Sequence, residues 1–188
     1  MKIVIIGGVA AGAKAAAKSK RLIPNAEVSI YTQDKNVSYS TCGLPYYIEG
    51  TFEDWHKLIV RPISEFEKSG INVYTEHLVT KILPDKKQIK VKNLATEDIL
   101  TIKYDKLVIA TGAKPITKGF EKYEQKNIYT LRTLENGVAI RNKMREVENI
   151  TLIGGGYINI ELLEAFVKNG KNVVLIEKSP FIMSILDE

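Results

Sequence analysis

The sequence of 188 residues contains one cysteine, one tryptophan and two histidines, and these scarcities exclude several classes of protein. A single cysteine cannot build an internal disulfide framework, and a free thiol suits a reducing compartment, so we expect a cytoplasmic protein. Neither His56 nor His77 has a partner at metal-ligand spacing, so no metal site is expected. No apolar run reaches the roughly 18 residues that span a bilayer, so no membrane segment is expected.

The excess of positive charge is small and evenly spread. The formal net charge is +5, but lysine and glutamate are mixed along the chain, without an arginine-rich or aromatic-interleaved patch. This pattern argues against nucleic acid as a partner and favours small anionic molecules. The apolar opening of residues 1–17 imitates a secretory signal, but Gly7-Gly8 and Lys14 interrupt it.

Two strand–glycine turn–helix–strand patterns stand out against this background. In the first, a β-branched run at residues 2–6 precedes the glycine turn 7–12, a small-residue helix to about Leu22 and a strand at 27–31. Such a βαβ unit holds a pyrophosphate on the helix amides. The match to G-x-G-x-x-G is imperfect, because Val9 stands where the second glycine belongs.

The second pattern includes the acidic residue that dinucleotide-binding units carry at the end of their second strand. A strand at 149–153 leads into the glycine turn 154–159, a helix, and a strand at 172–176 that ends in Glu177. Asn159 occupies the third glycine position, but the acid lies about 20 residues beyond the turn, as dinucleotide binding requires. Two such units are more specific than either alone. The alternative is a pair of ordinary α/β turns.

The intervening chain predicts a mixture of strands and one short helix. The expected helix begins after Pro62 and ends at Lys68, and the expected strands span 71–74, 77–83, 88–91 and 99–104. A buried strand at 106–113, ending in a glycine turn, should return the chain to the first parallel sheet. A further helix is expected at 133–147.

The only cysteine lies in the stretch 38–47. Thr41 is a plausible cap for a helix over 42–49, whose unpaired amides would favour a thiolate at Cys42. A lone cysteine is also commonly a small buried hydrophobe, so reactive and packed interpretations both remain open.

These features together resemble the pyridine nucleotide-disulfide oxidoreductases, in particular the FAD-dependent single-cysteine type. The most specific motif is Ser38-x-x-x-Cys42-Gly43-Leu44-Pro45-Tyr46-Tyr47. The resemblance implies an α/β fold: an FAD/NAD(P)-binding Rossmann-like parallel sheet with an inserted antiparallel β meander, plus an incomplete second nucleotide-binding βαβ unit. The implied domains are residues 1–113 for FAD and residues 114–188 for NAD(P).

The resemblance also implies roles for individual residues, with Cys42 as the catalytic redox centre. The residues implied for FAD are Gly7, Gly8, Ala10, Ala11, Gly12, Thr32, Gln33, Thr41, Val79, Ala110, Thr111, Gly112 and Arg132. Those implied for NAD(P)H are Gly154, Gly156, Tyr157, Ile158, Asn159 and Glu177. Because a carboxylate at Glu177 would bond a ribose 2′-hydroxyl and repel a 2′-phosphate, NADH is expected to be preferred.

Substrate contacts are implied along the first helix and beside the sulfur. Lys14, Lys18 and Arg21 recur at i, i+4 and i+7 and share one helix face, which suits the phosphates of coenzyme A or is simply a solvated surface. Ser38 and Thr41 match substrate-side positions near the thiol. In the helix after Pro62, an expected lysine is replaced by Ser69.

Three departures from the family pattern refine this prediction. Ala10 stands where oxidases and peroxidases commonly carry a histidine, which favours the coenzyme A-disulfide branch. Thr32 replaces the acid usual at the FAD ribose, and Asn159 replaces a glycine.

The predicted function is transfer of electrons from NAD(P)H through FAD to Cys42, reducing a small disulfide such as coenzyme A disulfide. The alternatives are NADH oxidase or persulfide reductase chemistry, or an inactive nucleotide-binding module. The nicotinamide unit is short for the family, so we expect a fragment that does not turn over alone, and a homodimeric full-length form.

Overall fold

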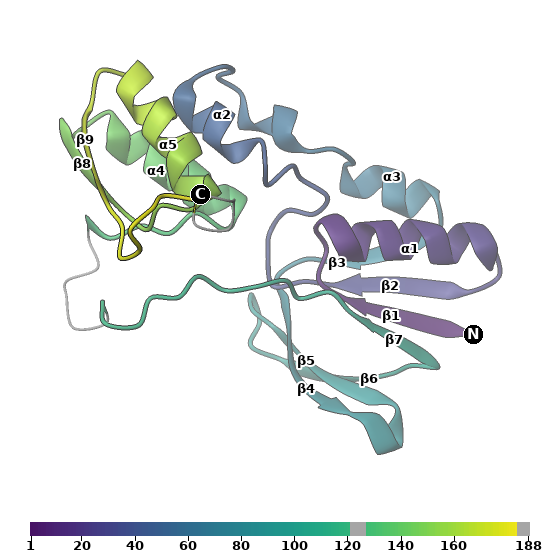
Figure 1. The fold of residues 1–188 in the computed structure, drawn as a ribbon. Coiled ribbons are helices and arrows are strands. Elements are labelled where there is room, and N and C mark those ends of the chain that lie inside the picture. The colour runs from purple at the N-terminus through teal and green to yellow at the C-terminus, as the bar shows by residue number, and fades with distance from the viewer. Residues whose placement is uncertain (121–126, 184–188) are drawn as a thin grey trace. The chain divides into compact units, whose positions relative to one another are not determined.

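The computed structural model describes residues 1–120 and 127–183. The chain divides into two compact units (Figure 1). Unit 1 comprises Met1–Ser40 and Ile59–Ala113, and unit 2 comprises Thr41–Leu58 and Lys114–Glu188. The cysteine-bearing segment Thr41–Leu58 groups with the later part of the chain.

Unit 1 is built on a parallel sheet in the order β3-β2-β1-β7. Its strands are β1 (Lys2–Ile6), β2 (Glu27–Tyr31), β3 (Ile71–Tyr74) and β7 (Lys106–Ile109). The register pairs Ile5 with Ile30 on one side and with Val108 on the other. Nearly every residue of β1 and β2 is buried, because parallel strands are covered on both faces.

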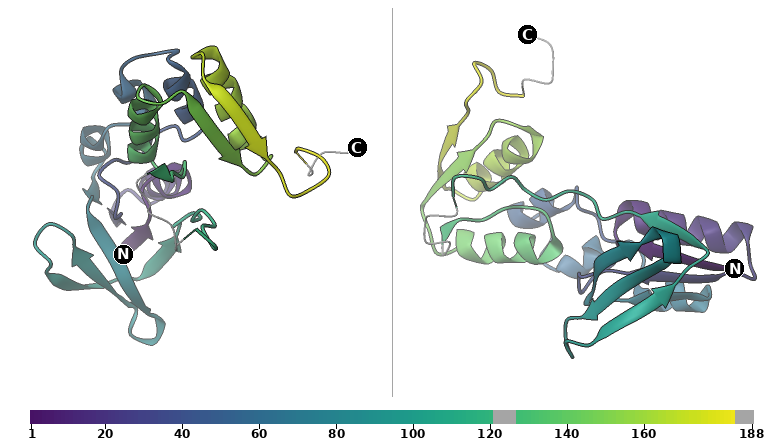
Figure 2. Two further views of the ribbon diagram at one scale, coloured as in Figure 1. Left: turned by 90° about the vertical axis from the view of Figure 1, so that its left-hand side faces the viewer. Right: turned by 90° about the horizontal axis from the view of Figure 1, so that it is seen from below.

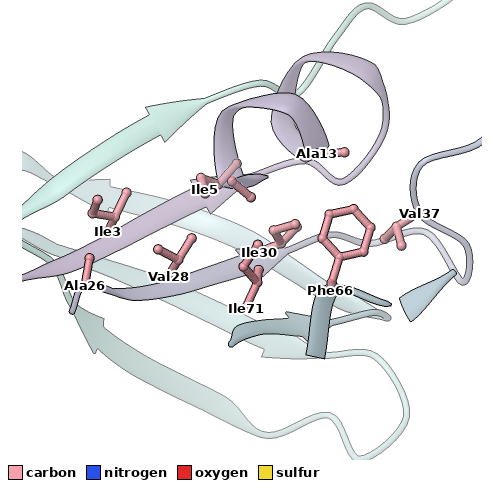
Figure 3. Packing of buried hydrophobic residues seen from close by; sticks show 10 residues of the cluster. Ile3, Ile5, Ala13, Ala26, Val28, Ile30, Val37, Phe66 and Ile71 are labelled. Atoms are coloured by element: carbon pink, nitrogen blue, oxygen red, sulfur yellow. The ribbon is translucent and has the colours of Figure 1, made fainter. Parts of the chain in front are cut away.

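Two helices cover one face of this sheet. They are α1 (Ala10–Leu22) and α3 (Ile63–Lys68). Figure 3 shows isoleucines of β1 and β2 converging on Phe66 of α3 and on Ala13 of α1, with Val37 at the edge of the cluster. The small Ala13 and the fully buried Ala16 let α1 lie close to the strands.

An antiparallel meander covers the other face. It consists of β4 (His77–Leu83), β5 (Gln88–Asn93) and β6 (Ile99–Lys103), with the short 3-10 turn η2 (Pro84–Lys86) between the first two (Figure 1). Ile89 and Val91 of β5 pack against Val4, Ile6 and Tyr31 of the parallel sheet.

Unit 2 carries a parallel pair of strands with helices beside it (Figure 2). Its elements are α2 (Leu44–Glu49), the 3-10 helix η1 (Trp55–Leu58), α4 (Leu134–Met144), β8 (Asn149–Ile153), α5 (Tyr157–Lys168) and β9 (Asn172–Ile176). Leu162, Ala165 and Phe166 are the buried residues of α5.

Three sequence predictions need correction. The helix expected over 42–49 begins at Leu44, with Gly43 rather than Thr41 at its N-terminal boundary. The strand expected over 106–113 ends at Ile109, which is 62% exposed because β7 is the edge strand of its sheet. The helix expected over 133–147 ends at Met144.

Candidate functional site

The first glycine turn is too tight for side chains at two positions. Gly7 has φ +101°, and a Cβ there would lie 2.2 Å from the carbonyl oxygen of Ala110. A Cβ on Gly12 would lie 1.9 Å from the carbonyl oxygen of Gly7. The turn therefore brings the backbone of α1 directly onto the end of β1, as a pyrophosphate cradle requires.

The first turn of α1 is free of competing side-chain groups. Its N-terminal boundary residue Val9 makes no side-chain cap, and there is no acid in the first turn. Ala13 donates the first intrahelical bond, to Val9, which leaves the amides of Ala10, Ala11 and Gly12 directed out of the helix end. These residues fit the diphosphate of FAD.

The second predicted turn of unit 1 lies against the first. The Ala110 amide donates to the Ile6 carbonyl at 2.8 Å, and Gly112 has φ +70°. Thr111 is exposed. The structure thus brings Gly7 and Ala110–Gly112 together at one end of the parallel sheet.

Thr32 occupies the position at which an acid is usual for the FAD ribose, so this position carries no carboxylate. Thr32 is buried, and its hydroxyl accepts a hydrogen bond from the Asp34 amide at 3.3 Å. Gln33 is exposed. The side chain of Val79 packs against the cluster of Val4, Ile6 and Tyr31, and Val79 is paired with Val91 of β5.

An aromatic group at the same edge was missed by sequence reasoning. Tyr31 stacks on Tyr74 with ring centres 4.7 Å apart, and His77 lies edge-on to Tyr31 at 6.3 Å. Burial, then the neighbouring Tyr74 and Glu27, raises the pKa of Tyr31 to about 12. The signal in the sequence was that Tyr31 and Tyr74 each end an expected strand. The parallel pairing of β2 with β3 then places these two residues side by side.

Cys42 is an exposed free thiol, so the packed interpretation is wrong. It lies in a turn closed by a hydrogen bond from the Leu44 amide to the Thr41 carbonyl at 3.3 Å. Thr41 makes no cap of α2, because the helix starts beyond the turn that contains the sulfur.

Ser38 holds an unusual backbone conformation in unit 1. Its φ of +48° is rare for a residue with a side chain. Its amide donates to the Gly8 carbonyl at 2.8 Å, and its carbonyl accepts from the Val60 amide at 2.8 Å. This backbone therefore ties the first glycine turn to the segment that leads into α3.

The glycine turn of unit 2 is open where a ligand would approach. Gly154 has φ +100°, whereas a Cβ on Gly156 would meet nothing within 4 Å. Asn159 replaces the third glycine and donates from Nδ2 to the carbonyls of Ile153 and Gly154, both at 2.8 Å. Tyr157 and Ile158 are exposed in the first turn of α5.

Glu177 is fixed at the end of β9. Its carboxylate accepts hydrogen bonds from the Ser179 amide at 2.7 Å and from the Gly155 amide. These two bonds hold the pKa of the Glu177 carboxyl below its usual range. The acid at the end of β9 is thus joined to the glycine turn by a hydrogen bond.

Unit 1 also contains a basic cavity of about 320 Å³ between α1 and α3. Its charged and polar lining comprises Lys20, Arg21, Arg61 and Ser69. Arg21 was predicted as an anion contact, but Lys20 and Arg61 were not. Lys14 and Lys18 are exposed on α1 and are not among the lining residues of the cavity in the described chain.

Arg61 is held in place at this cavity. Its Nη2 donates to the Ser69 hydroxyl at 2.6 Å and to the Glu65 carbonyl at 3.0 Å, and its guanidinium lies 4.3 Å from the Phe66 ring centre. Ser69, which replaces the expected lysine, thus anchors an arginine. The two residues are eight positions apart across α3, a relation that spacing alone did not indicate.

Arg132 precedes α4 in unit 2. Its amide donates to the Asn136 side chain at 3.2 Å. Thr133 and Asn136 form a reciprocal capping box that fixes the start of α4 directly after Arg132.

Two absences concern residues 1–120 and 127–183 alone. No helix in these ranges is long and apolar enough to cross a membrane. Within the same ranges, no three histidine, cysteine, aspartate or glutamate side chains form a group that could hold a metal ion.

Comparison with known proteins identifies the class of this molecule. The family described as pyridine nucleotide-disulphide oxidoreductase matches residues 1–188, so the chain belongs to this family. It is 35% identical over 177 residues to an NADH oxidase of Enterococcus faecalis, covering 94% of this chain and 40% of the relative. It is 33% identical over 189 residues to a coenzyme A disulfide reductase of Staphylococcus aureus, covering 99% and 42% respectively.

A solved structure agrees with this membership. The water-forming NADH oxidase of Lactobacillus brevis, bound to NADH, superimposes with a TM-score of 0.93 at 32% identity, covering 98% of this chain and 41% of that one. The chain thus spans about two fifths of the length of these relatives. The predicted family, the Rossmann-like fold class and the cofactor class of FAD with NAD(P)H are confirmed.

Proposed function

We propose that this chain is the part of a coenzyme A-disulfide reductase that binds FAD, carries the redox cysteine and begins the NADH site. The basic cavity between α1 and α3 is the observation that carries this proposal. Three cationic side chains, Lys20, Arg21 and Arg61, line one cavity, and they suit the multiple phosphates of coenzyme A. Two of these cations also have partners within the chain: Lys20 donates to the Ala26 carbonyl at 2.8 Å, and Arg61 donates to Ser69 and Glu65.

The cysteine performs the proposed chemistry on the disulfide. The Cys42 thiolate attacks one sulfur of coenzyme A disulfide, and the sulfur–sulfur bond breaks as the new one forms. The departing coenzyme A thiolate takes a proton from solvent, leaving a mixed disulfide on Cys42. Exposure of the thiol gives the attacking sulfur access to its partner. FAD, when bound and reduced by NADH, would supply the two electrons that cleave the mixed disulfide, which would release the second coenzyme A and return Cys42 to its thiolate.

The proposed FAD contacts are the glycine turn Gly7–Gly12, Thr32, Gln33, Thr41, Val79, the Ala110–Gly112 turn and Arg132. The amides at the start of α1 would hold the diphosphate. The hydroxyl of Thr32 already accepts a bond from Asp34, so Gln33 is the freer ribose partner. Ser38 and Thr41 stay proposed as substrate-side residues.

The proposed nicotinamide contacts are Gly154, Gly156, Tyr157, Ile158, Asn159 and Glu177. The fixed Glu177 carboxylate supports a preference for NADH, because it would repel a 2′-phosphate. We further propose a cytoplasmic location and a homodimeric full-length form.

NADH oxidation is the second candidate, since one relative has that activity. Ala10, which replaces a histidine common in that branch, favours disulfide reduction instead.

The test uses the reduced chain and two disulfides, coenzyme A disulfide and neutral hydroxyethyl disulfide. Mass spectrometry follows mixed-disulfide formation, and Cys42→Ser must abolish it. Arg21→Glu should slow reaction with coenzyme A disulfide several-fold and leave the neutral disulfide unchanged. Lys103→Glu, an exposed charge reversal on β6, is the matched control. Equal rates for wild type and Arg21→Glu with coenzyme A disulfide would reject the cavity as the substrate site.

A further inference from the structure

Arg141 on α4 is a buried cation that the proposed reaction does not use. It is 3% exposed, and the acceptors of its side-chain hydrogen bonds lie 88 or 89 residues earlier in the chain. Nη1 donates to the carbonyls of Phe52 and Glu53 at 3.1 and 3.2 Å, and Nη2 donates to Glu53 Oε1 at 2.7 Å. The guanidinium also lies 4.5 Å from the ring centre of Tyr47.

The segment that Arg141 binds is the continuation of the Cys42 turn. One residue, Gly43, separates Cys42 from the start of α2; Tyr47 lies on α2, and Phe52 and Glu53 follow the helix. Gly50 ends the helix at φ +97°, with its amide bonded to the carbonyl of Tyr47. A helix of six residues is not stable by itself, so its formation and position depend on tertiary contacts such as these.

Two further contacts fix α2 between helices of unit 2. A Cβ on Gly137 of α4 would lie 2.7 Å from Leu44, so the two helices touch closely there. At the other end, Asn169 donates to the Glu49 carbonyl at 2.8 Å, and Lys168 pairs with the Glu49 carboxylate at 3.2 Å. Among these contacts, the Arg141 guanidinium is the group that hydrogen-bonds the backbone of the segment after the helix.

We infer that Arg141 is a positioning residue for Cys42, an inference that rests on the proposed thiol function. By joining two carbonyls, a carboxylate and an aromatic ring, it acts with the contacts of Gly137, Lys168 and Asn169 to fix the helix whose preceding turn carries the sulfur. A lysine cannot reproduce this fork, because its single ammonium lacks the planar set of donors. Arg145, 59% exposed and 3.6 Å from the same Glu53, is a matched control.

The experiment compares wild type with Arg141→Met, Arg141→Lys and Arg145→Met in the 188-residue chain. Hydrogen exchange of residues 44–53 reports the position of α2. Peptides from α5 report whether unit 2 as a whole stays folded, and peptides from α1 report the same for unit 1. Alkylation by iodoacetamide across pH 6–9 reports Cys42 alone, because the chain has one cysteine. For Arg141→Met we expect exchange at 44–53 to rise at least tenfold and the alkylation rate constant to change more than threefold. Arg141→Lys should recover part of both effects, and Arg145→Met should show neither.

Wild-type values for Arg141→Met, or equal effects from Arg145→Met, would overturn the inference. If Arg141→Met does not fold, Glu53→Gln is the substitute variant, because it removes the carboxylate and keeps both carbonyl hydrogen bonds. Unchanged exchange at residues 44–53 in Glu53→Gln would contradict the inference. Neither readout uses a disulfide. Failure of wild-type Cys42 to form a mixed disulfide would therefore reject the proposed function separately.

Discussion

Gly12 illustrates how one hydrogen atom in place of a side chain permits the first nucleotide turn. A Cβ at this position would fall 1.9 Å from the Gly7 carbonyl oxygen, so Gly12→Val must displace backbone. We expect a destabilisation of at least about 2 kcal/mol and loss of FAD retention. Flavin absorbance after purification and urea unfolding measure the two effects.

Gly156→Ala is the control for this change. A Cβ there meets nothing within 4 Å, so stability should change by less than about 1 kcal/mol and flavin should be kept. A yellow Gly12→Val protein of wild-type stability would contradict the assignment of this turn.

Tyr31 gives unit 1 a pH dependence at alkaline pH. Burial raises its pKa from 10.0 to about 12, so the folded state holds the phenolic proton more tightly than the unfolded chain. The associated stability is complete below pH 10 and is lost as pH rises toward 12. Tyr31→Phe removes the titration. The difference in unfolding free energy between wild type and Tyr31→Phe should fall by about 2 kcal/mol between pH 9 and pH 11.5. A difference that stays constant over that range would show that Tyr31 is not shielded.

At the scale of elements, the sequence predicted the features that depend on local pattern. Both βαβ units follow from short apolar runs and glycine turns, and the strands of the β4–β6 meander follow from strand propensity. The start of α2 was mispredicted because a threonine before a proline-containing run imitates a cap. The cavity residues Lys20 and Arg61 and the clamp from Arg141 to Glu53 were missed, because tertiary packing, not spacing, brings them to their partners.

The start of α4 is an element whose stability can be tested directly. The Thr133 hydroxyl accepts from the Asn136 amide at 3.3 Å, and the Asn136 side chain accepts from the Thr133 amide at 3.0 Å. Thr133→Ala should cost about 1 kcal/mol, and Thr133→Ser should restore most of it. Thermal unfolding followed by circular dichroism compares the three proteins. An alanine variant as stable as wild type would mean that packing alone fixes this helix start.

At the scale of the molecule, the two units differ in how their sheets are covered. The parallel sheet of unit 1 has four strands, with helices on one face and a meander on the other. The sheet described in unit 2 has two strands, and Ile153, Val174 and Ile176 are each more than half exposed. Sheets of two strands have little independent stability, because few side chains are removed from water.

We therefore expect unit 2 to open before unit 1. Hydrogen exchange in native conditions should show faster exchange for amides of β8 and β9 than for those of β1 and β2, by at least about a hundredfold. Exposed apolar side chains on the same strands should also cause concentration-dependent association, measurable by sedimentation velocity. Val174→Thr keeps the β-branched shape while adding a hydroxyl, so it should reduce association without speeding exchange in β1. Equal protection of the two sheets would mean that α4 and α5 stabilise β8 and β9 as fully as the meander and helices stabilise unit 1.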